Sequence, residues 1–137
     1  TIALPGIFQP VVHEGMILSD GGAVMPVPVT PARAMADGRP IVAINLQGDD
    51  IARRAAVGIK DGEDAKLTTL SVVRSATGLM LSKLARLSLD QDPPDLELRL
   101  PVGHIDTSNF TRAEDLIEIG RREAVKAIPE IERLIDG

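Results

Sequence analysis

A single carboxylate stands between a short apolar run and two glycines near the start of the chain. Asp20 follows the residues MILS and precedes Gly21 and Gly22. Taken alone, Asp-Gly-Gly is typical of a solvated turn, since Asp side chains bond to nearby backbone groups and Gly permits sharp bends. In α/β proteins, however, functional groups lie where apolar strands end. Asp20 is therefore the first candidate for an acid or base, with a structural turn as the competing explanation.

Three further sets of residues could carry chemistry, and each has a simpler explanation. Thr1 could act as a nucleophile with its own α-amine as the base, but nothing else in the sequence supports this role. We expect His13 and His104 to be surface or structural residues, one in a turn and one near a strand end. The acidic run 61–64 lacks the ligand spacing of a calcium-binding loop, so a solvated loop is expected there.

The composition of the 137 residues excludes several classes of protein. There is no cysteine, which rules out disulfides, thiolate catalysis and Cys-type zinc sites, and two histidines are too few for a histidine-rich metal site. A net charge of −5 and 1% aromatic residues argue against nucleic-acid binding. No apolar run reaches about 18 residues, so we expect no transmembrane segment. We also expect no cofactor, no metal and, for a Cys-free chain without a signal peptide, a cytoplasmic location.

The elements that would position Asp20 follow from patterns in the first third of the chain. A start rich in Pro, Gly and β-branched residues predicts a strand at 16–19 and an extended edge at 24–29. A short helix capped by Thr30 and ended by Gly38 is expected next. It leads into a strand within 40–48, which is buried because that run is apolar on both faces.

The rest of the chain predicts two helices and one strand. Residues 48–65 are polar and are expected to form a surface excursion. Apolar residues recur at spacings of three and four over 66–87, as in a helix, until a run with two prolines interrupts it. Residues 96–102 alternate like a strand with one covered face. A capping-box pattern at Thr111 begins a last helix, which Pro129 is expected to kink or end.

Helices that alternate with strands predict an α/β protein with a mainly parallel sheet. The sequence contains no serine elbow of the form G-x-S-x-G, no Walker loop and no G-x-G-x-x-G. The residues by themselves therefore indicate an α/β domain with one candidate aspartate.

Three blocks of the sequence, in order, resemble the bacterial patatin-like phospholipase family. The first is LPGIFQP at 4–10, the second is DGG at 20–22 with MPVPV at 25–29, and the third is RPIVAINLQG at 39–48. The segment 104–124, HIDTSNFTRAEDLIEIGRREA, is similar to the helix that ends these domains. Together the blocks cover most of the chain, and the resemblance is weakest over its middle third.

The resemblance implies a three-layer α/β/α patatin-like sandwich, of which 1–137 would be the C-terminal portion. It also implies a Ser–Asp dyad that hydrolyses lipid acyl esters, a phospholipase or esterase activity. Asp20 falls on the dyad aspartate, which would accept or orient the serine proton. Gly21 and Gly22 would let the backbone turn without a side chain that blocks the acid. A dyad of this kind needs no histidine and no cofactor.

The same resemblance gives weaker expectations for the surroundings of the site. Pro5, Gly6 and Phe8 would shape the neighbouring loop and one wall of the acyl pocket. The family's serine elbow and glycine-rich oxyanion loop both lie upstream of the matched region. We therefore expect this chain alone to be inactive and to need a complementary N-terminal chain or segment. A non-catalytic patatin-like fragment or binding module is the alternative. Either way, so few strands should leave a sheet edge and apolar surface exposed.

Overall fold

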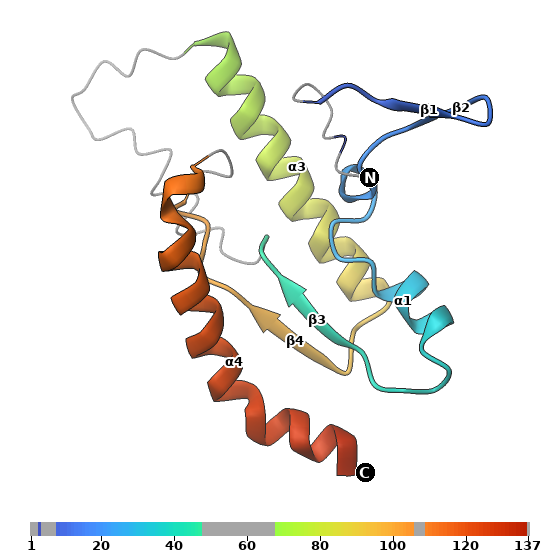
Figure 1. Ribbon diagram of the computed structural model, residues 1–137, viewed down its shortest axis with the longest axis vertical. Helices are drawn as coiled ribbons and strands as arrows, with labels where there is room; N and C mark the ends of the chain where they lie inside the picture. Colours follow the sequence, from blue (N-terminus) through green and yellow to red (C-terminus); the bar gives the residue numbers. More distant parts are fainter. Residues whose placement is uncertain (1–2, 4–7, 48–67, 106–108, 137) are drawn as a thin grey trace.

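The computed structural model describes Ala3 and residues 8–47, 68–105 and 109–136 (Figure 1). The described part is mixed α/β, with two small sheets and three α-helices. Its elements, in chain order, are β1 (Val11–His13), β2 (Met16–Leu18), the 3-10 turn η1 (Gly21–Ala23), α1 (Val29–Met35), β3 (Val42–Asn45), α3 (Thr69–Gln91), β4 (Leu96–Arg99), the 3-10 turn η2 (Phe110–Arg112) and α4 (Ala113–Asp136). The predicted surface excursion at 48–65 lies outside the described residues.

The two sheets differ in the direction of their strands. β1 and β2 form an antiparallel hairpin, whose two loop residues, Glu14 and Gly15, have φ values of 49° and 76°. Such left-handed values are typical of two-residue hairpin turns. β3 and β4 pair in parallel, with Val42 beside Leu96, and α3 lies between them in the sequence as in a βαβ unit. The expectation of a mainly parallel sheet is thus met only by β3 and β4, because the tight turn pairs the strand before Asp20 with β1 instead.

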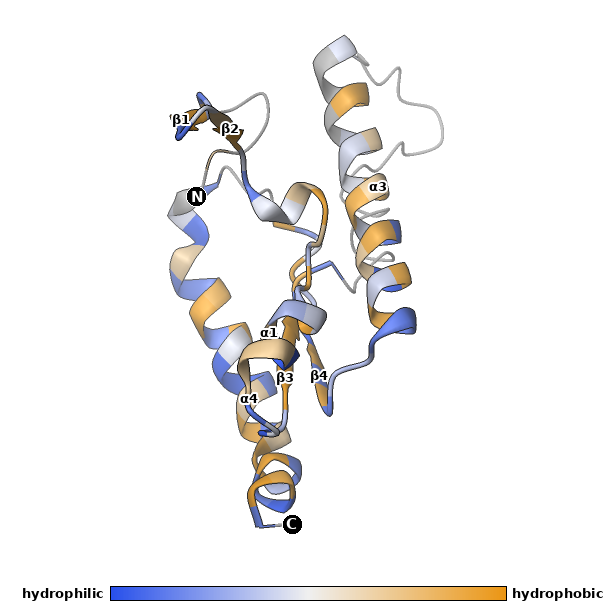
Figure 2. Cartoon of the chain, turned by 90° about the vertical axis from the view of Figure 1, so that its right-hand side faces the viewer, coloured by the Kyte–Doolittle hydropathy of each residue, from blue (hydrophilic) through white to orange (hydrophobic). Residues whose placement is uncertain are grey.

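The parallel pair lies between two helices, α3 on one side and α4 on the other (Figure 2). Ala43 of β3 packs into a buried cluster with Ala85 and Leu89 of α3. Leu96 is also buried, and it shares a small pocket between β4 and α4 with Ala127. Since neighbouring residues of a strand point to opposite faces, one face of the pair meets α3 and the other meets α4.

Much of the apolar surface of these elements has no cover within the described part of the chain. Val42 and Ile44 of β3 are 40% and 61% exposed. α3 also carries exposed apolar side chains, and apolar and polar colours alternate along it in Figure 2. The exposed members on α3 are Val72, Val73, Leu79, Met80 and Leu87. The described elements therefore leave a large part of their apolar surface uncovered.

The start of α1 differs from the sequence-based expectation. Thr30 was expected to cap the helix, but α1 begins at Val29 and no side chain caps it. Val29 is buried in the core cluster, which fixes the first helical residue before Thr30. The helix ends at Met35, and Gly38 follows with a φ of 79°, in keeping with a turn that closes the helix.

The expected extended edge at 24–29 is not a strand. Val27 and Val29 instead insert into the buried cluster beside Ala43. Pro26 and Pro28 have no N–H to donate, so this stretch is poorly suited to a ladder but well suited to a fixed, irregular path.

The start of α4 and the effect of Pro129 also differ from the sequence-based expectation. Thr111 does not form a capping box: it lies in η2, and its hydroxyl lies 2.6 Å from Asn109 Oδ1. α4 begins at Ala113 and continues past Pro129 to Asp136, with a change of axis direction in its C-terminal half (Figure 1). Of the two effects expected of Pro129, ending the helix is therefore wrong.

Candidate functional site

Asp20 lies just after β2, on an extended backbone that leads into η1. Its φ and ψ are −65° and 127°. The Asp20 N–H donates to the Ala3 carbonyl over 3.0 Å, and the Ser19 hydroxyl donates to the same carbonyl over 2.9 Å. Ala3 is itself buried. Two hydrogen bonds thus hold the end of the strand against a buried residue from the start of the chain.

The Asp20 carboxylate caps the 3-10 turn that follows it. Its Oδ1 accepts a hydrogen bond from the Gly22 N–H over 2.7 Å. The residue is half-buried, and within the described residues no cation pairs with it and Oδ2 receives no hydrogen bond. One oxygen is therefore oriented by the backbone while the other is available to accept a proton or a hydrogen bond from a further group.

The two glycines after Asp20 have different relations to its carboxylate. A Cβ added at Gly22 would lie 2.8 Å from Asp20 Oδ1, closer than a carbon and a carboxylate oxygen can approach. A Cβ added at Gly21 would meet nothing within 4 Å. A side chain at position 22 would therefore force the Asp20 carboxylate to move, whereas one at position 21 would not.

Of the other candidate side chains, the structure describes His13, His104 and Phe8. His13 is exposed on β1, with Nε2 3.9 Å from Glu14 Oε1, and His104 is exposed after β4; neither hydrogen-bonds to Asp20. Phe8 is 51% exposed and lines neither of the two pockets described below. Thr1, Pro5, Gly6 and the acidic run 61–64 lie outside the described residues.

A second polar group, which the sequence patterns did not single out, lies toward the carboxyl ends of the parallel strands. Asn45 ends β3 and is buried, and its Nδ2 donates to Glu97 Oε1 of β4 over 2.7 Å. Arg99 Nη2 donates to the other oxygen, Glu97 Oε2, over 2.8 Å. The Gln47 N–H donates to Asn45 Oδ1 over 2.8 Å, so the buried amide is well satisfied. In the sequence, this polar group is indicated only by Asn45, a polar residue inside an otherwise apolar run.

The charge of Glu97 is maintained by its neighbours. Burial would raise the pKa of this carboxyl, whose side chain is only 16% exposed. The hydrogen bonds from Arg99 and Asn45, together with the Arg99 charge, outweigh the burial and leave the pKa of Glu97 lowered. Because both carboxylate oxygens are already occupied, this group ties β3 to β4 rather than offering a free acid or base.

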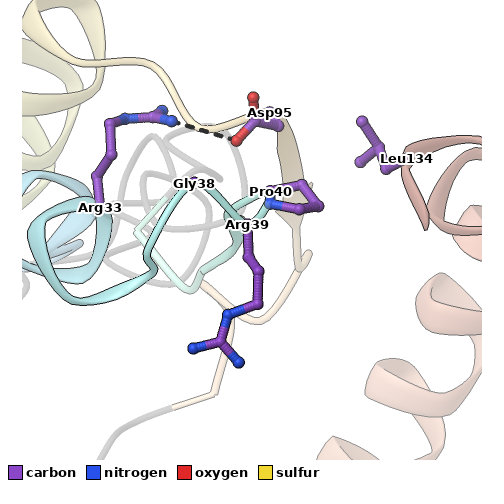
Figure 3. A pocket seen from close by; sticks show the side chains of 6 residues that line it. All are labelled: Arg33, Gly38, Arg39, Pro40, Asp95 and Leu134. Carbon is purple, nitrogen blue, oxygen red and sulfur yellow. Dashed lines mark hydrogen bonds and ion pairs between the residues drawn. The ribbon is translucent and has the colours of Figure 1, made fainter. Parts of the chain in front are cut away.

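A pocket lined in part by charged residues lies at the opposite end of the parallel strands (Figure 3). It has a volume of about 400 Å³ and is lined by Arg33, Gly38, Arg39, Pro40, Asp95 and Leu134. Pro40 and Asp95 immediately precede β3 and β4, so the pocket is at the amino ends of the strands. Ligand sites of parallel sheets lie at the carboxyl ends, and none of the candidate residues in the described part of the chain lines this pocket. A smaller pocket of about 240 Å³ lies between β4 and α4.

Comparison with protein-family models gave no match for the chain. Within the described residues, no group of three or more His, Asp or Glu side chains is arranged to hold a metal ion. None of the described helices combines the length and the apolar character needed to cross a membrane.

Proposed function

We propose that this chain contributes the dyad aspartate, Asp20, to a serine hydrolase of lipid acyl esters. A chain or segment that carries a G-x-S-x-G elbow would supply the nucleophile and the oxyanion donors. The observation that carries the proposal is the Asp20 carboxylate, with Oδ1 held by the Gly22 N–H at 2.7 Å and Oδ2 without a partner in the described part of the chain. The resemblance of three sequence blocks to patatin-like phospholipases supplies the substrate class.

The chemistry of a dyad suits this carboxylate. A serine hydroxyl attacks an ester carbonyl only when a base accepts or orients its proton. A carboxylate with one oxygen fixed by the backbone presents its second oxygen in a defined direction, and general-base assistance of this kind contributes about 10²–10⁴-fold in rate. The chain holds no serine elbow, and each missing oxyanion donor costs about 10²–10³-fold, so the chain alone is expected to be inactive.

The exposed apolar surface supports a complementary segment. A parallel sheet is normally covered on both faces and extended beyond two strands, yet Val42 and Ile44 of β3 are largely exposed. Further strands and helices from a serine-bearing segment would cover this surface. With no cysteine in the chain, we propose the cytoplasm as the place of action.

The test uses Asp20→Asn in the protein that contains both this chain and the serine elbow. We expect hydrolysis of a p-nitrophenyl acyl ester to fall by about 10²–10⁴-fold, because an amide cannot accept the serine proton. Asp37→Asn is the matched control, since Asp37 is an exposed acid on the turn after α1 and should leave the rate unchanged. Circular dichroism checks that both variants fold. Retained hydrolysis in folded Asp20→Asn would refute the dyad.

A non-catalytic binding module is the second candidate. It is favoured by the Asp20–Gly22 hydrogen bond, which by itself is an ordinary structural turn. In this case a serine-bearing partner would not exist, and neither the chain nor its complexes would hydrolyse acyl esters.

A further inference from the structure

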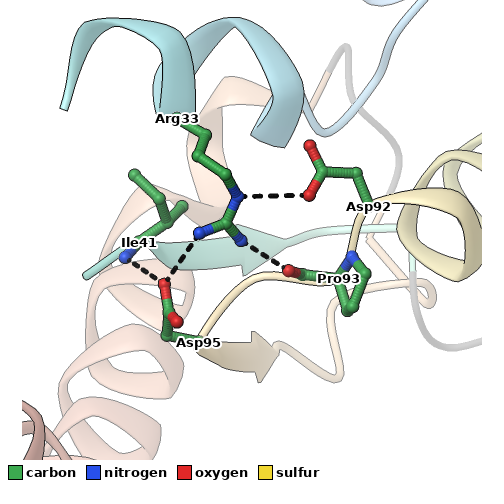
Figure 4. A network of polar contacts seen from close by, with 5 residues as sticks. All are labelled: Arg33, Ile41, Asp92, Pro93 and Asp95. Atoms are coloured by element: carbon green, nitrogen blue, oxygen red, sulfur yellow. Dashed lines mark hydrogen bonds and ion pairs between the residues drawn. The ribbon is translucent and has the colours of Figure 1, made fainter. Parts of the chain in front are cut away.

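The guanidinium of Arg33 joins α1 to the connection between α3 and β4 (Figure 4). Arg33 Nε lies 3.2 Å from Asp92 Oδ1, Nη1 lies 3.3 Å from Asp95 Oδ2, and Nη2 donates to the Pro93 carbonyl over 2.7 Å. All three nitrogens are therefore used. The hydrogen bond to Asp92 raises the pKa of Arg33 although burial opposes it, which keeps the charge fixed.

The acceptors lie where the secondary-structure elements begin and end. Asp92 directly follows α3, and Asp95 directly precedes β4. Asp95 Oδ2 also accepts from the Ile41 N–H over 2.7 Å, one residue before β3. Arg33 thus holds α1 to the segment between α3 and β4, and Asp95 in turn links that segment to the residue before β3.

The same segment of chain carries Asp20. The backbone hydrogen bonds of η1 are local, from Ala23 to Asp20 and from Val24 and Met25 to Gly21. They shape the turn but do not fix its place relative to the parallel strands. Downstream, that place depends on the burial of Val27 and Val29 and then on the Arg33 contacts.

We propose that Arg33 is a positioning residue that fixes where the Asp20 turn lies relative to the parallel strands. The catalytic consequence of this positioning rests on the proposed function. Arg33 acts through α1 and does not touch the reacting atoms. Lysine cannot replace it, because a single ammonium cannot reach three acceptors set in a fork around a planar group.

Amide hydrogen exchange of the chain itself tests the positioning without any enzymatic activity. In Arg33→Lys we expect the amides of Gly22, Val24 and Met25 to exchange roughly two- to fivefold faster, the size expected for the loss of partly exposed charge-assisted contacts. The amide of Leu100, which bonds to Asn45 at the far end of the parallel ladder, should not change.

Two further variants make the exchange result specific. Arg39→Lys is the control: Arg39 lies on the same connection, and within the described residues its side chain donates to the nearby Ala36 carbonyl and not to the segment between α3 and β4. It should leave all these amides unchanged. Asp92→Asn keeps an acceptor oxygen but removes a charge, so it should shift the same amides as Arg33→Lys by a smaller factor. Unchanged exchange at Gly22–Met25 in Arg33→Lys, or an equal rise at Leu100, would overturn the proposal.

Kinetics then separate the positioning role from the proposed function. In the protein that contains the serine elbow, Arg33→Lys should lower kcat while KM for the acyl ester stays the same, because substrate binding is intact and the base is displaced. Unchanged kcat with accelerated exchange would overturn the catalytic part of the proposal. If Asp20→Asn leaves hydrolysis intact, the proposed function fails instead, whatever the exchange rates in Arg33→Lys.

Discussion

At the scale of single residues, the Asp20 turn is an arrangement of one carboxylate and one backbone N–H. The 2.7 Å hydrogen bond from Gly22 to Asp20 Oδ1 leaves no room for a side chain at position 22. Gly21 has no such neighbour. Substitution of the two adjacent glycines is therefore expected to have different effects on stability.

Gly22→Ala should displace the carboxylate, whereas Gly21→Ala should be tolerated. Loss of the Gly22–Asp20 hydrogen bond should lower the free energy of unfolding by about 1 kcal/mol. Gly21→Ala, the matched control, should stay within about 0.5 kcal/mol of the unmodified chain. Urea denaturation measures both. Under the proposed function, Gly22→Ala should also reduce kcat in the protein that carries the serine elbow. Equal effects of the two substitutions would contradict the close packing described at position 22.

At the scale of elements, the parallel pair is joined by a polar group on the face that meets α3. One carboxylate oxygen of Glu97 in β4 accepts a hydrogen bond from Asn45 of β3, and the other accepts one from Arg99. The helices differ in how they are held: α1 and α3 share the small apolar cluster, α1 also has the Arg33 contacts, and α4 contacts β4. The charged form of Glu97 therefore contributes to the stability of the βαβ unit.

This contribution should depend on pH in a defined direction. The pKa of Glu97 is lowered in the folded chain, so its contribution is complete above the ordinary value of about 4.5 and is lost as the pH falls through the lower folded-state value. In Glu97→Gln, we expect the free energy of unfolding to fall less between pH 5 and pH 3 than in the unmodified chain. Glu118→Gln, at an exposed position on α4, should keep the original pH dependence. Urea denaturation across this range measures both, and an unchanged slope in Glu97→Gln would contradict the assignment.

At the scale of the whole molecule, the described part buries little for the number of apolar residues it contains. Among the described residues, eight hydrophobic residues are buried and none of these is larger than leucine, while twenty large hydrophobic side chains are exposed. Apolar patches of this extent mark surfaces that bind another chain or aggregate. The βαβ unit thus has exposed apolar surface on several sides against which further strands or helices can pack.

The chain by itself should therefore bind 8-anilinonaphthalene-1-sulfonate and self-associate. We expect a strong rise in dye fluorescence at neutral pH and a mass above the monomer by light scattering, because α3 and β3 expose apolar faces. Addition of a serine-bearing segment should lower the fluorescence by covering them. A chain that is monomeric and does not increase the fluorescence of the dye would contradict the presence of this exposed apolar surface.

Several elements followed from the sequence because their causes are local. The apolar run before Asn45, the helical spacing before Gln91 and the alternation from Leu96 predicted β3, α3 and β4. The Asp-Gly-Gly turn at Asp20 is likewise set by the side chain and the residues beside it. Spacing and turn chemistry act over a few residues, and for this reason a sequence reveals them.

Other features were decided only by tertiary structure, because their partners are far apart in the sequence. Asn45 meets Glu97 across 52 positions, and Arg33 meets Asp92 across 59. Because Val27 and Val29 are buried in the apolar cluster, the segment expected to be an edge strand packs into the core instead. For the same reason α1 begins at Val29 rather than after Thr30. The sequence by itself determined which segments form the βαβ unit and where a carboxylate sits on a turn. Three-dimensional packing determined which strands pair and which side chains meet, since those choices depend on surfaces that no local pattern specifies.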